Sequence, residues 1–450
     1  MSYPFRSIRD YLDWLDKNDY LLHVKDKVSN KWMTAAVGKE LFARCGYGYG
    51  ASPKAALYEN LEGYPGTRSC NMIFGHIDFI SAIVGSTREK LFEDLGKKIA
   101  SPKPPIMVKE GLFMEKPFRE NECDIYKEIP VETTNEKQAG PFFTLWCLSY
   151  KDPNINEYAL SMARHQVKSE RKLGVLLLPG QHLQEVYGKH KEMKENIPIA
   201  LINSPPPTVI LATQTRVPRK LWKMSVAGAL QDEGIECVKT DINNLPVPAT
   251  SEYVLEGEIV VDQLEDEGPF GTYTGYYDFP RKMPIINVKA LYHRENPIYN
   301  TCVFGKPPSE GAFIGEIMMS FSLTQLYRTF CPEVKTVRML STYGLITVIA
   351  LNKKLKMKGS VLRVGSLAAA LQPGLKLCIL VDDDIDCYSV EDILWAICTR
   401  WAPNKSQLIG PLPGFLDPSE RWQTGEDMLC LLYTSPSPRD LSTSRMPSSA

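Results

Sequence analysis

The first hundred residues alternate helical patterns of apolar positions with short apolar runs. Apolar residues recur at helical spacing from Ile8 to Leu15, directly after Ser7, a residue type that caps helices. A further helix is predicted over 89–99, and the proline-rich stretch that follows cannot continue it. We therefore predict an N-terminal α/β domain over residues 1–105.

The pattern changes at residue 106, where short β-rich segments begin to follow one another between turn residues such as Gly268 and Pro269. One helix is predicted within this region, over 219–229. Many short strands with regular turn signals are typical of a β-barrel or sandwich, so we predict a second domain over 106–305. The predicted strands are 175–178, 208–211, 253–255, 259–261 and 285–288.

Helices and strands mix again after residue 305. Helical periodicity covers 314–329 and 389–400, and apolar strands are predicted at 346–349 and 377–381. The pattern indicates a third, α/β domain over 306–430. Residues 431–450 are rich in Ser, Pro and Thr and bury too few apolar side chains to fold, so we predict a disordered or artefactual tail there.

Composition narrows the class of protein. The 450 residues carry 52 Lys and Arg against 53 Asp and Glu, which gives no electrostatic reason to expect nucleic acid or an anionic membrane surface. No apolar run approaches the roughly 20 residues of a membrane span, and the start lacks the apolar run of a secretory signal. Eleven scattered cysteines without a C-x-x-C pair fit reduced thiols, so we expect a cytoplasmic protein.

Two chemistry-bearing patterns have simple structural explanations. The glycine-rich run at 46–50 follows a predicted helix and precedes a strand, the reverse of the dinucleotide-binding order, so we interpret it as a flexible loop. Carboxylates at 382–386 follow an apolar strand and suggest either a Mg²⁺ site or an acidic turn before the next helix. We favour the acidic turn, because acids near a helix start are stabilised by the helix dipole.

Three other segments suggest a site for an anion. The stretch 265–277 combines three consecutive acids, glycines and aromatic residues, and mutual repulsion is expected to raise the pKa of at least one acid. A hairpin with solvated acids is the alternative. Arg164 and His182 each stand beside a β-rich run, and arginine is suited to binding carboxylates or phosphates.

Several motifs in one order resemble the UbiD family of prenylated-FMN-dependent reversible decarboxylases. The resemblance extends over about residues 5–420. The motifs that carry it are 8–12, 56–65, 140–144, 267–271, 274–277, 305–308, 381–386, 393–396 and 399–400.

The resemblance implies an α/β multi-domain fold. A central split β-barrel of flavin-reductase type would hold the cofactor between an N-terminal α/β domain and a C-terminal α/β domain used in oligomerisation. Arg164 and Glu267 would be two members of the family's Arg-Glu-Glu catalytic set. The residues that would bind prenylated FMN are Ser161, Met162, Ala163, Arg164, Gln181, His182 and Thr213.

Three positions depart from the family pattern. The acid that donates the proton falls at Thr272, whose hydroxyl is not an acid at pH 7. The family's divalent metal, usually Mn²⁺, takes an Asn, a His and a Glu. Here His182 remains, but Ala159 and Lys223 occupy the other two positions. We hypothesise that Lys223 neutralises the flavin phosphate, because an ammonium supplies about the same net charge as a glutamate with a divalent cation.

The sequence therefore predicts a decarboxylase of an aromatic or α,β-unsaturated carboxylic acid, with prenylated FMN as cofactor and an uncertain Mn²⁺. A flavin prenyltransferase would supply the cofactor, and a homodimer or larger homo-oligomer is expected. The alternative is a non-catalytic paralogue, a subunit or scaffold that keeps the fold but has degraded metal and acid sites.

Overall fold

The computed structural model describes residues 3–307, 309–340, 345–372 and 375–401, together with strands Ile409–Leu412 and Met428–Cys430. The tail predicted at 431–450 lies outside these residues. The chain divides into two compact units, Met1–Ser322 and Leu323–Ala450. The division into three domains stays a prediction.

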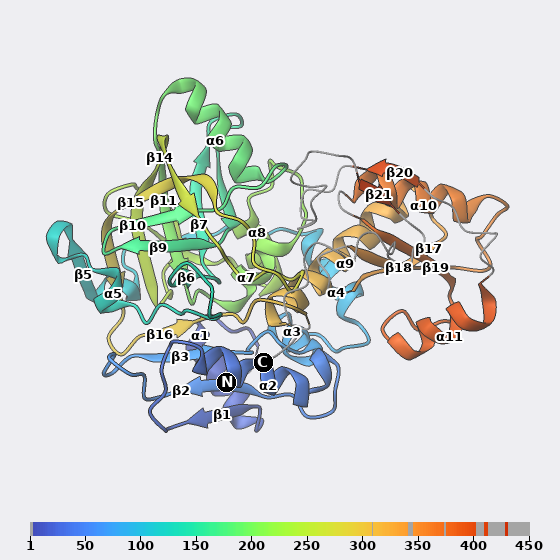
Figure 1. The fold of residues 1–450 in the computed structure, drawn as a ribbon, viewed down its shortest axis with the longest axis horizontal. Helices are drawn as coiled ribbons and strands as arrows, with labels where there is room; N and C mark the ends of the chain where they lie inside the picture. The colour runs from blue at the N-terminus through green and yellow to red at the C-terminus, as the bar shows by residue number, and fades with distance from the viewer. Residues whose placement is uncertain are drawn as a thin grey trace. The chain divides into compact units, whose positions relative to one another are not determined.

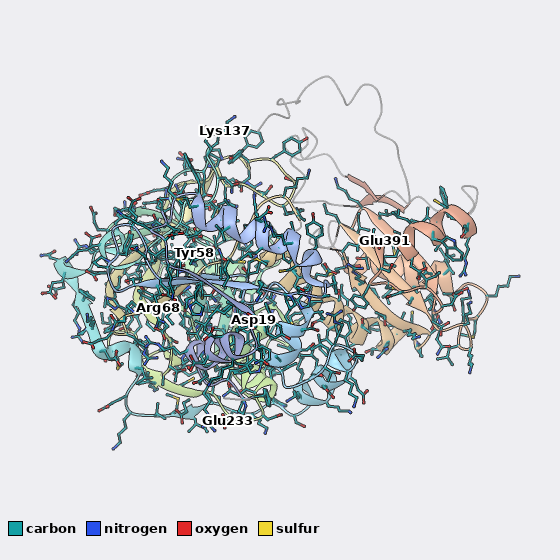
Figure 2. All side chains as sticks on the ribbon, turned by 90° about the horizontal axis from the view of Figure 1, so that it is seen from below. Asp19, Tyr58, Arg68, Lys137, Glu233 and Glu391 are labelled. Carbon is teal, nitrogen blue, oxygen red and sulfur yellow. The ribbon has the colours of Figure 1, made fainter. Side chains whose placement is uncertain are left out.

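The first unit begins with helix α1 (Ile8–Lys17), and the predicted cap is confirmed. The Oγ of Ser7 accepts a hydrogen bond from the backbone N–H of Asp10 at 3.1 Å, and the helix buries its apolar face. A four-stranded sheet, in the order β1-β2-β3-β16, follows, and Tyr58 of β2 is buried within it (Figure 2). The elements are β1 Leu21–Val24, α2 Met33–Arg44, η1 Gly46–Gly48, β2 Ala55–Tyr58, β3 Arg68–Asn71, α3 Ile77–Ile83, α4 Leu91–Ile99 and β16 Ile298–Asn300.

The centre of the first unit is a nine-stranded sheet in which every neighbouring pair is antiparallel. Its order is β6-β9-β10-β15-β14-β11-β7-β8, with β5 paired to β15. The sheet curls, and helix α6 covers one end of it (Figure 1). The strands are β5 Lys116–Arg119, β6 Phe142–Phe143, β7 Cys147–Asp152, β8 Glu157–Met162, β9 His165–Ser169, β10 Lys172–Val175, β11 Ile197–Asn203, β14 Tyr253–Glu267 and β15 Arg281–His293.

Smaller elements surround this sheet. They comprise a three-stranded sheet in the order β13-β12-β4 and several short helices. Their bounds are β4 Ile106–Met107, η2 Leu112–Glu115, η3 Glu120–Glu122, α5 Ile125–Glu128, α6 His182–Met193, α7 Pro207–Gln214, α8 Lys223–Leu230, β12 Glu236–Lys239 and β13 Pro246–Pro248. The predicted fold class, an α/β protein around a central split β-barrel, is confirmed.

Three local predictions are wrong or displaced. The strand expected at 208–211 is part of helix α7, which Pro207 begins at the first helical position. A short apolar run that is fully buried has no hydrophobic periodicity that would distinguish a strand from a helix. The helix expected over 219–229 begins only at Lys223, after a turn. Of the strand expected at 175–178, only Val175 lies in β10.

The second unit contains a three-stranded sheet in the order β17-β18-β19, with helices on the same stretch of chain. The strands predicted at 346–349 and 377–381 and the helices predicted at 314–329 and 389–400 are confirmed. The elements are α9 Glu310–Phe330 (which starts in the first unit), β17 Val334–Met339, β18 Ile346–Leu351, α10 Ser360–Leu371, β19 Leu377–Asp382, α11 Val390–Arg400, β20 Ile409–Leu412 and β21 Met428–Cys430. Within the described ranges, no helix is both long and apolar enough to cross a membrane.

Candidate active site

Arg164 lies in the short connection between β8 and β9 and forms ion pairs with two carboxylates. Its Nε and Nη2 atoms each lie 2.8 Å from one oxygen of Glu267, the last residue of β14. Nη2 also lies 2.6 Å from Oδ2 of Asp278. Burial alone would lower the pKa of Arg164, but the hydrogen bonds and charges of the two carboxylates raise it above its ordinary value. The guanidinium is therefore charged, and two-pronged pairing fixes its orientation.

Two aromatic rings and a tight turn surround the guanidinium of Arg164. Its central carbon lies 4.7 Å from the ring centre of Phe270 and 5.8 Å from that of Phe142, within cation–π range. Gly268 has φ +94°, a conformation that favours glycine, and its N–H donates to Oε1 of Gln166 at 3.1 Å. The turn after β14 is thus fixed so that its aromatic ring packs on the cation.

The three acids that end β14 do not share one environment. Side chains alternate between the faces of a strand, so Glu265 and Glu267 share one face and Asp266 lies on the other. Glu265 accepts a hydrogen bond from Lys172 at 2.9 Å, which lowers its pKa, and Asp266 pairs with Lys282 at 3.0 Å. The pKa of Glu265 is lowered rather than raised because a neighbouring lysine compensates its charge, and the expectation that at least one of the three acids has a raised pKa stays a prediction.

His182 is the first residue of α6, and its ring is held by an acid on β7. Its Nε2 lies 2.7 Å from Oδ2 of Asp152. Burial alone would raise the pKa of Asp152, but hydrogen bonds from His182 and Asn154 lower it. The imidazole meets Tyr150 edge-on at 5.9 Å between ring centres, and the Tyr150 hydroxyl lies 2.7 Å from Oγ of Ser161. These contacts connect α6 to β8, the strand that leads to the arginine.

A group of cations lies at the start of α8. The Nζ of Lys223 donates to the backbone carbonyl of Thr213 at 2.5 Å. Burial, with the positive charges of Arg219 and Arg216, lowers the pKa of Lys223 to about 8. The charge of Arg219 also acts on Tyr150, so this cationic group adjoins the histidine cluster. Two arginines beside one buried ammonium form a donor set suited to a phosphate dianion.

The other residues expected in the site lie on several different elements. Met162 ends β8 and Ala163 follows it, directly before the arginine, and Gln181 is the residue that precedes α6. The hydroxyl of Thr272 lies 2.6 Å from that of Thr274 and 3.1 Å from a backbone carbonyl, so it is engaged within the β14–β15 turn. The roles of all these residues stay predictions.

The divalent metal that the family resemblance implies does not fit the side chains found here. The described residues contain no group of three or more His, Cys, Asp or Glu side chains that could hold a metal ion. His182 is paired with Asp152, Ala159 is a buried methyl side chain on β8, and Lys223 supplies a cation. A phosphate-bearing cofactor, by contrast, fits the cationic group at α8.

Asp278, Phe142 and the arginines beside Lys223 were missed at the level of sequence. Asp278 directly follows the 274–277 motif, but an aspartate after a hairpin turn is also common as a capping residue, so its position alone does not reveal its partner. Only the fold shows that the turn brings it back to a guanidinium 114 residues away in the chain.

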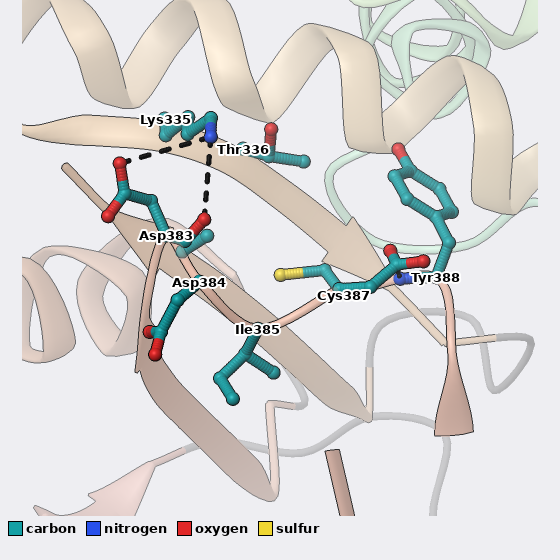
Figure 3. A pocket seen from close by; sticks show the side chains of 9 residues that line it. Lys335, Thr336, Asp383, Asp384, Ile385, Cys387 and Tyr388 are labelled. Atoms are coloured by element: carbon teal, nitrogen blue, oxygen red, sulfur yellow. Dashed lines mark hydrogen bonds and ion pairs between the residues drawn. The ribbon is translucent and has the colours of Figure 1, made fainter. Parts of the chain in front are cut away.

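The acidic stretch 382–386 lies in the second unit, where the turn that it forms borders a cavity of about 320 Å³ (Figure 3). Asp384 lies 2.8 Å from Arg400 and 3.1 Å from Lys353. Lys335 reaches the carboxylate and backbone carbonyl of Asp383, as Figure 3 shows. Because basic side chains pair with these acids, the contacts favour the interpretation as an acidic turn.

Two family models match the chain. Residues 107–307 match the model described as the 3-octaprenyl-4-hydroxybenzoate carboxy-lyase Rift-related domain, and residues 312–430 match the corresponding C-terminal domain. Among curated proteins, the phenolic acid decarboxylase of Bacillus subtilis (strain 168) is 28% identical over 423 residues, which cover 90% of this chain and 87% of the relative.

Solved structures agree with this match. The UbiD-class enzyme HmfF from Pelotomaculum thermopropionicum, in complex with FMN, superposes with a TM-score of 0.85 and 29% identity, over 94% of this chain and 92% of HmfF. The vanillic acid decarboxylase of Sedimentibacter hydroxybenzoicus has a TM-score of 0.84 and 25% identity, over 99% and 96%. The Bacillus and Sedimentibacter relatives are named as decarboxylases and HmfF as a UbiD-class enzyme. Together with the two family models they show that this chain belongs to the UbiD family.

Proposed function

We propose that this chain is a reversible, non-oxidative decarboxylase of an aromatic or α,β-unsaturated carboxylic acid, with prenylated FMN as its cofactor. The observation that carries the proposal is the pairing of Arg164 with Glu267 at 2.8 Å through both guanidinium nitrogens, at the two positions where the family resemblance expects catalytic residues. The relatives' names support the reaction class. One structure of HmfF is in complex with prFMN, which supports the cofactor.

Each residue type suits this reaction. When bound, prenylated FMN would supply the electron sink for loss of CO₂. The guanidinium of Arg164 would bind a carboxylate or an electron-rich cofactor atom, and Glu267 would hold the guanidinium in one orientation. Phe142 and Phe270 would exclude water from that face of the cation.

The flavin itself would be held along β8, α6 and α8. Ser161, Met162 and Ala163 would line the flavin ring. The further residues that would bind the cofactor are Gln181, His182, Thr213 and Lys223. Lys223, with Arg216 and Arg219, would neutralise the phosphate without a divalent metal, since the ligand set for Mn²⁺ is incomplete. A flavin prenyltransferase would supply the cofactor. A homo-oligomer is proposed because an evolved form of HmfF has been solved as a dimer.

A non-catalytic paralogue is the second candidate, and Thr272 is the observation that favours it. A threonine at the position of the family's proton-donating acid would fit a chain that keeps the fold and has lost turnover. Under this alternative the chain would serve as a subunit or scaffold for an active relative.

Co-expression with a flavin prenyltransferase separates the two candidates. The purified protein should carry a near-ultraviolet and visible flavin spectrum, and mass spectrometry of the extracted cofactor should give the prenylated mass. The Arg164→Ala variant serves as a comparison in the same assay. A colourless wild-type protein under these conditions would contradict the decarboxylase and favour the scaffold.

A further inference from the structure

We propose that Asp278 is the acid of this site: it takes up a proton when a carboxylate substrate binds and delivers that proton to the carbon that loses CO₂. The inference rests on the proposed function and identifies the group that takes over from the position occupied by Thr272.

Asp278 lies directly beside the guanidinium of Arg164. Oδ2 of Asp278 lies 2.6 Å from Nη2 of Arg164, on the same guanidinium that pairs with Glu267. Its other oxygen, Oδ1, accepts the backbone N–H of Phe270 at 2.7 Å, and its own N–H donates to the Phe270 carbonyl at 3.1 Å. The carboxyl is thus held against the cation by two independent contacts, while the Thr272 hydroxyl is engaged elsewhere in the turn.

Exposure to solvent distinguishes the carboxylate of Asp278 from that of Glu267. The side chain of Glu267 is 1% exposed, whereas those of Asp278 and Arg164 are 12% and 13% exposed. An acid that acts once per turnover must meet the substrate and must regain a proton from water. Asp278 meets this requirement better than the buried glutamate.

The net charge of Arg164, Glu267 and Asp278 explains why a proton should be taken up when the substrate binds. With both carboxylates ionised, Arg164, Glu267 and Asp278 sum to −1, and a substrate carboxylate adds a further negative charge beside them. Like charges at this range disfavour double ionisation, so one proton should enter with the substrate. Both carboxylates accept two hydrogen bonds. Glu267 takes both from the charged guanidinium, whereas Asp278 takes one from the guanidinium and one from a neutral backbone N–H, so the proton goes to Asp278.

Other charged groups near this turn lie around its edges. Arg281 stands opposite Glu267 in the β14–β15 register, and the Lys306 stem packs beside Gly275. Lys168 points to the backbone carbonyl of Asp266. None of these side chains can take up a proton at neutral pH, because arginine and lysine are already protonated there.

The step balances without an added oxidant or reductant. The bond between the substrate carbon and its carboxylate breaks, and CO₂ leaves. The electron pair that remains forms a C–H bond with the Asp278 proton, and the aspartate returns to its ionised form. The next substrate carboxylate brings in a proton from water.

The test measures proton uptake on binding, in protein loaded with ordinary FMN. Benzoate and cinnamate are titrated by calorimetry at pH 7 in two buffers with different ionisation enthalpies, which gives the number of protons taken up per bound acid. The expected value is about one for the wild type and for Asp278→Glu, and close to zero for Asp278→Asn. Asp266→Asn is the matched control, because that acid is 61% exposed and pairs with Lys282 at the surface.

A second arm uses protein loaded with prenylated FMN. Asp278→Asn should lower the rate of CO₂ release at least about 100-fold, the usual contribution of a positioned acid, and Thr272→Glu in that background should restore part of it. Proton uptake by Asp278→Asn equal to that of the wild type, or an undiminished rate of CO₂ release, would overturn the proposal. The binding titration needs no turnover, so failure of the decarboxylase proposal is distinguishable from failure of this one.

Discussion

Replacement of Lys223 by methionine should weaken flavin binding and remove its pH dependence between pH 7 and pH 9. The ammonium is buried beside Thr213, and burial with the charges of Arg216 and Arg219 lowers its pKa to about 8. If protonated Lys223 binds the flavin phosphate, the phosphate must favour the charged ammonium, and Lys223 must then retain its proton at higher pH.

The direction and size of the expected change in FMN affinity follow from the pKa of Lys223. As the pH rises above 8, Lys223 in the flavin-free protein loses its proton and its positive charge, so the affinity for FMN falls. Between pH 7 and pH 9 the apparent Kd of the wild type should rise about tenfold, which corresponds to about 1.4 kcal/mol. At pH 7 the variant should bind more weakly by about 10- to 100-fold, as expected for loss of one charge-assisted hydrogen bond of about 1.5–3 kcal/mol.

Neighbouring groups should not produce the same slope. Arg216 and Arg219 keep their charge throughout this range. The thiol of Cys147, a neighbour of Lys223, has its pKa raised by burial to about 12, so it stays uncharged from pH 7 to pH 9. A phosphate monoester is already doubly ionised above its second pKa of about 6.

The assay is a fluorescence titration of apoprotein with FMN at intervals of half a pH unit. Lys220→Met is the matched control, because this exposed lysine lies three residues away and should leave the affinity and its pH profile unchanged. A wild-type affinity that stays constant from pH 7 to pH 9, or a Lys223→Met variant with the wild-type slope, would refute the assignment of the phosphate to Lys223.

Two further predictions concern stability, and urea denaturation measures both. Arg164→Met should lower the free energy of unfolding at pH 7 by about 3–5 kcal/mol, because it leaves the buried Glu267 and its neighbour Asp278 without their cation. A loss below about 1 kcal/mol would contradict the ion-pair argument. Ser7→Ala should cost about 1 kcal/mol by removing the cap of α1, whereas Ser7→Thr should retain most of the stability, and equal losses in the two variants would argue against the cap.

Much of the fold was predictable because its signals are local. The cap of α1 at Ser7 and the helix over 389–400 depend on residues within one turn of each other, and both were found. The segment 208–211 was misassigned because its apolar residues are buried on all sides, so the sequence carries no period there. Pro207 was the available signal for a helix start.

The candidate site was predictable only as far as the family motifs reach. Those motifs place Arg164 and Glu267, and the fold brings the two together. Asp278 and the arginines beside Lys223 belong to contacts between segments far apart in the chain, and such contacts depend on strand register and on the path of a turn. Charge and spacing along one sequence do not determine either quantity.

Release of CO₂ from a panel of acrylic, phenolic and heteroaromatic acids tests the central claim most directly. Protein co-expressed with a flavin prenyltransferase should release CO₂ from at least one acid and should exchange the hydrogen of the product carbon with solvent deuterium. Glu267→Gln should abolish both while it retains the flavin spectrum. A fully loaded wild-type protein that performs neither reaction with any acid of the panel, or a Glu267→Gln variant with wild-type turnover, would contradict the account.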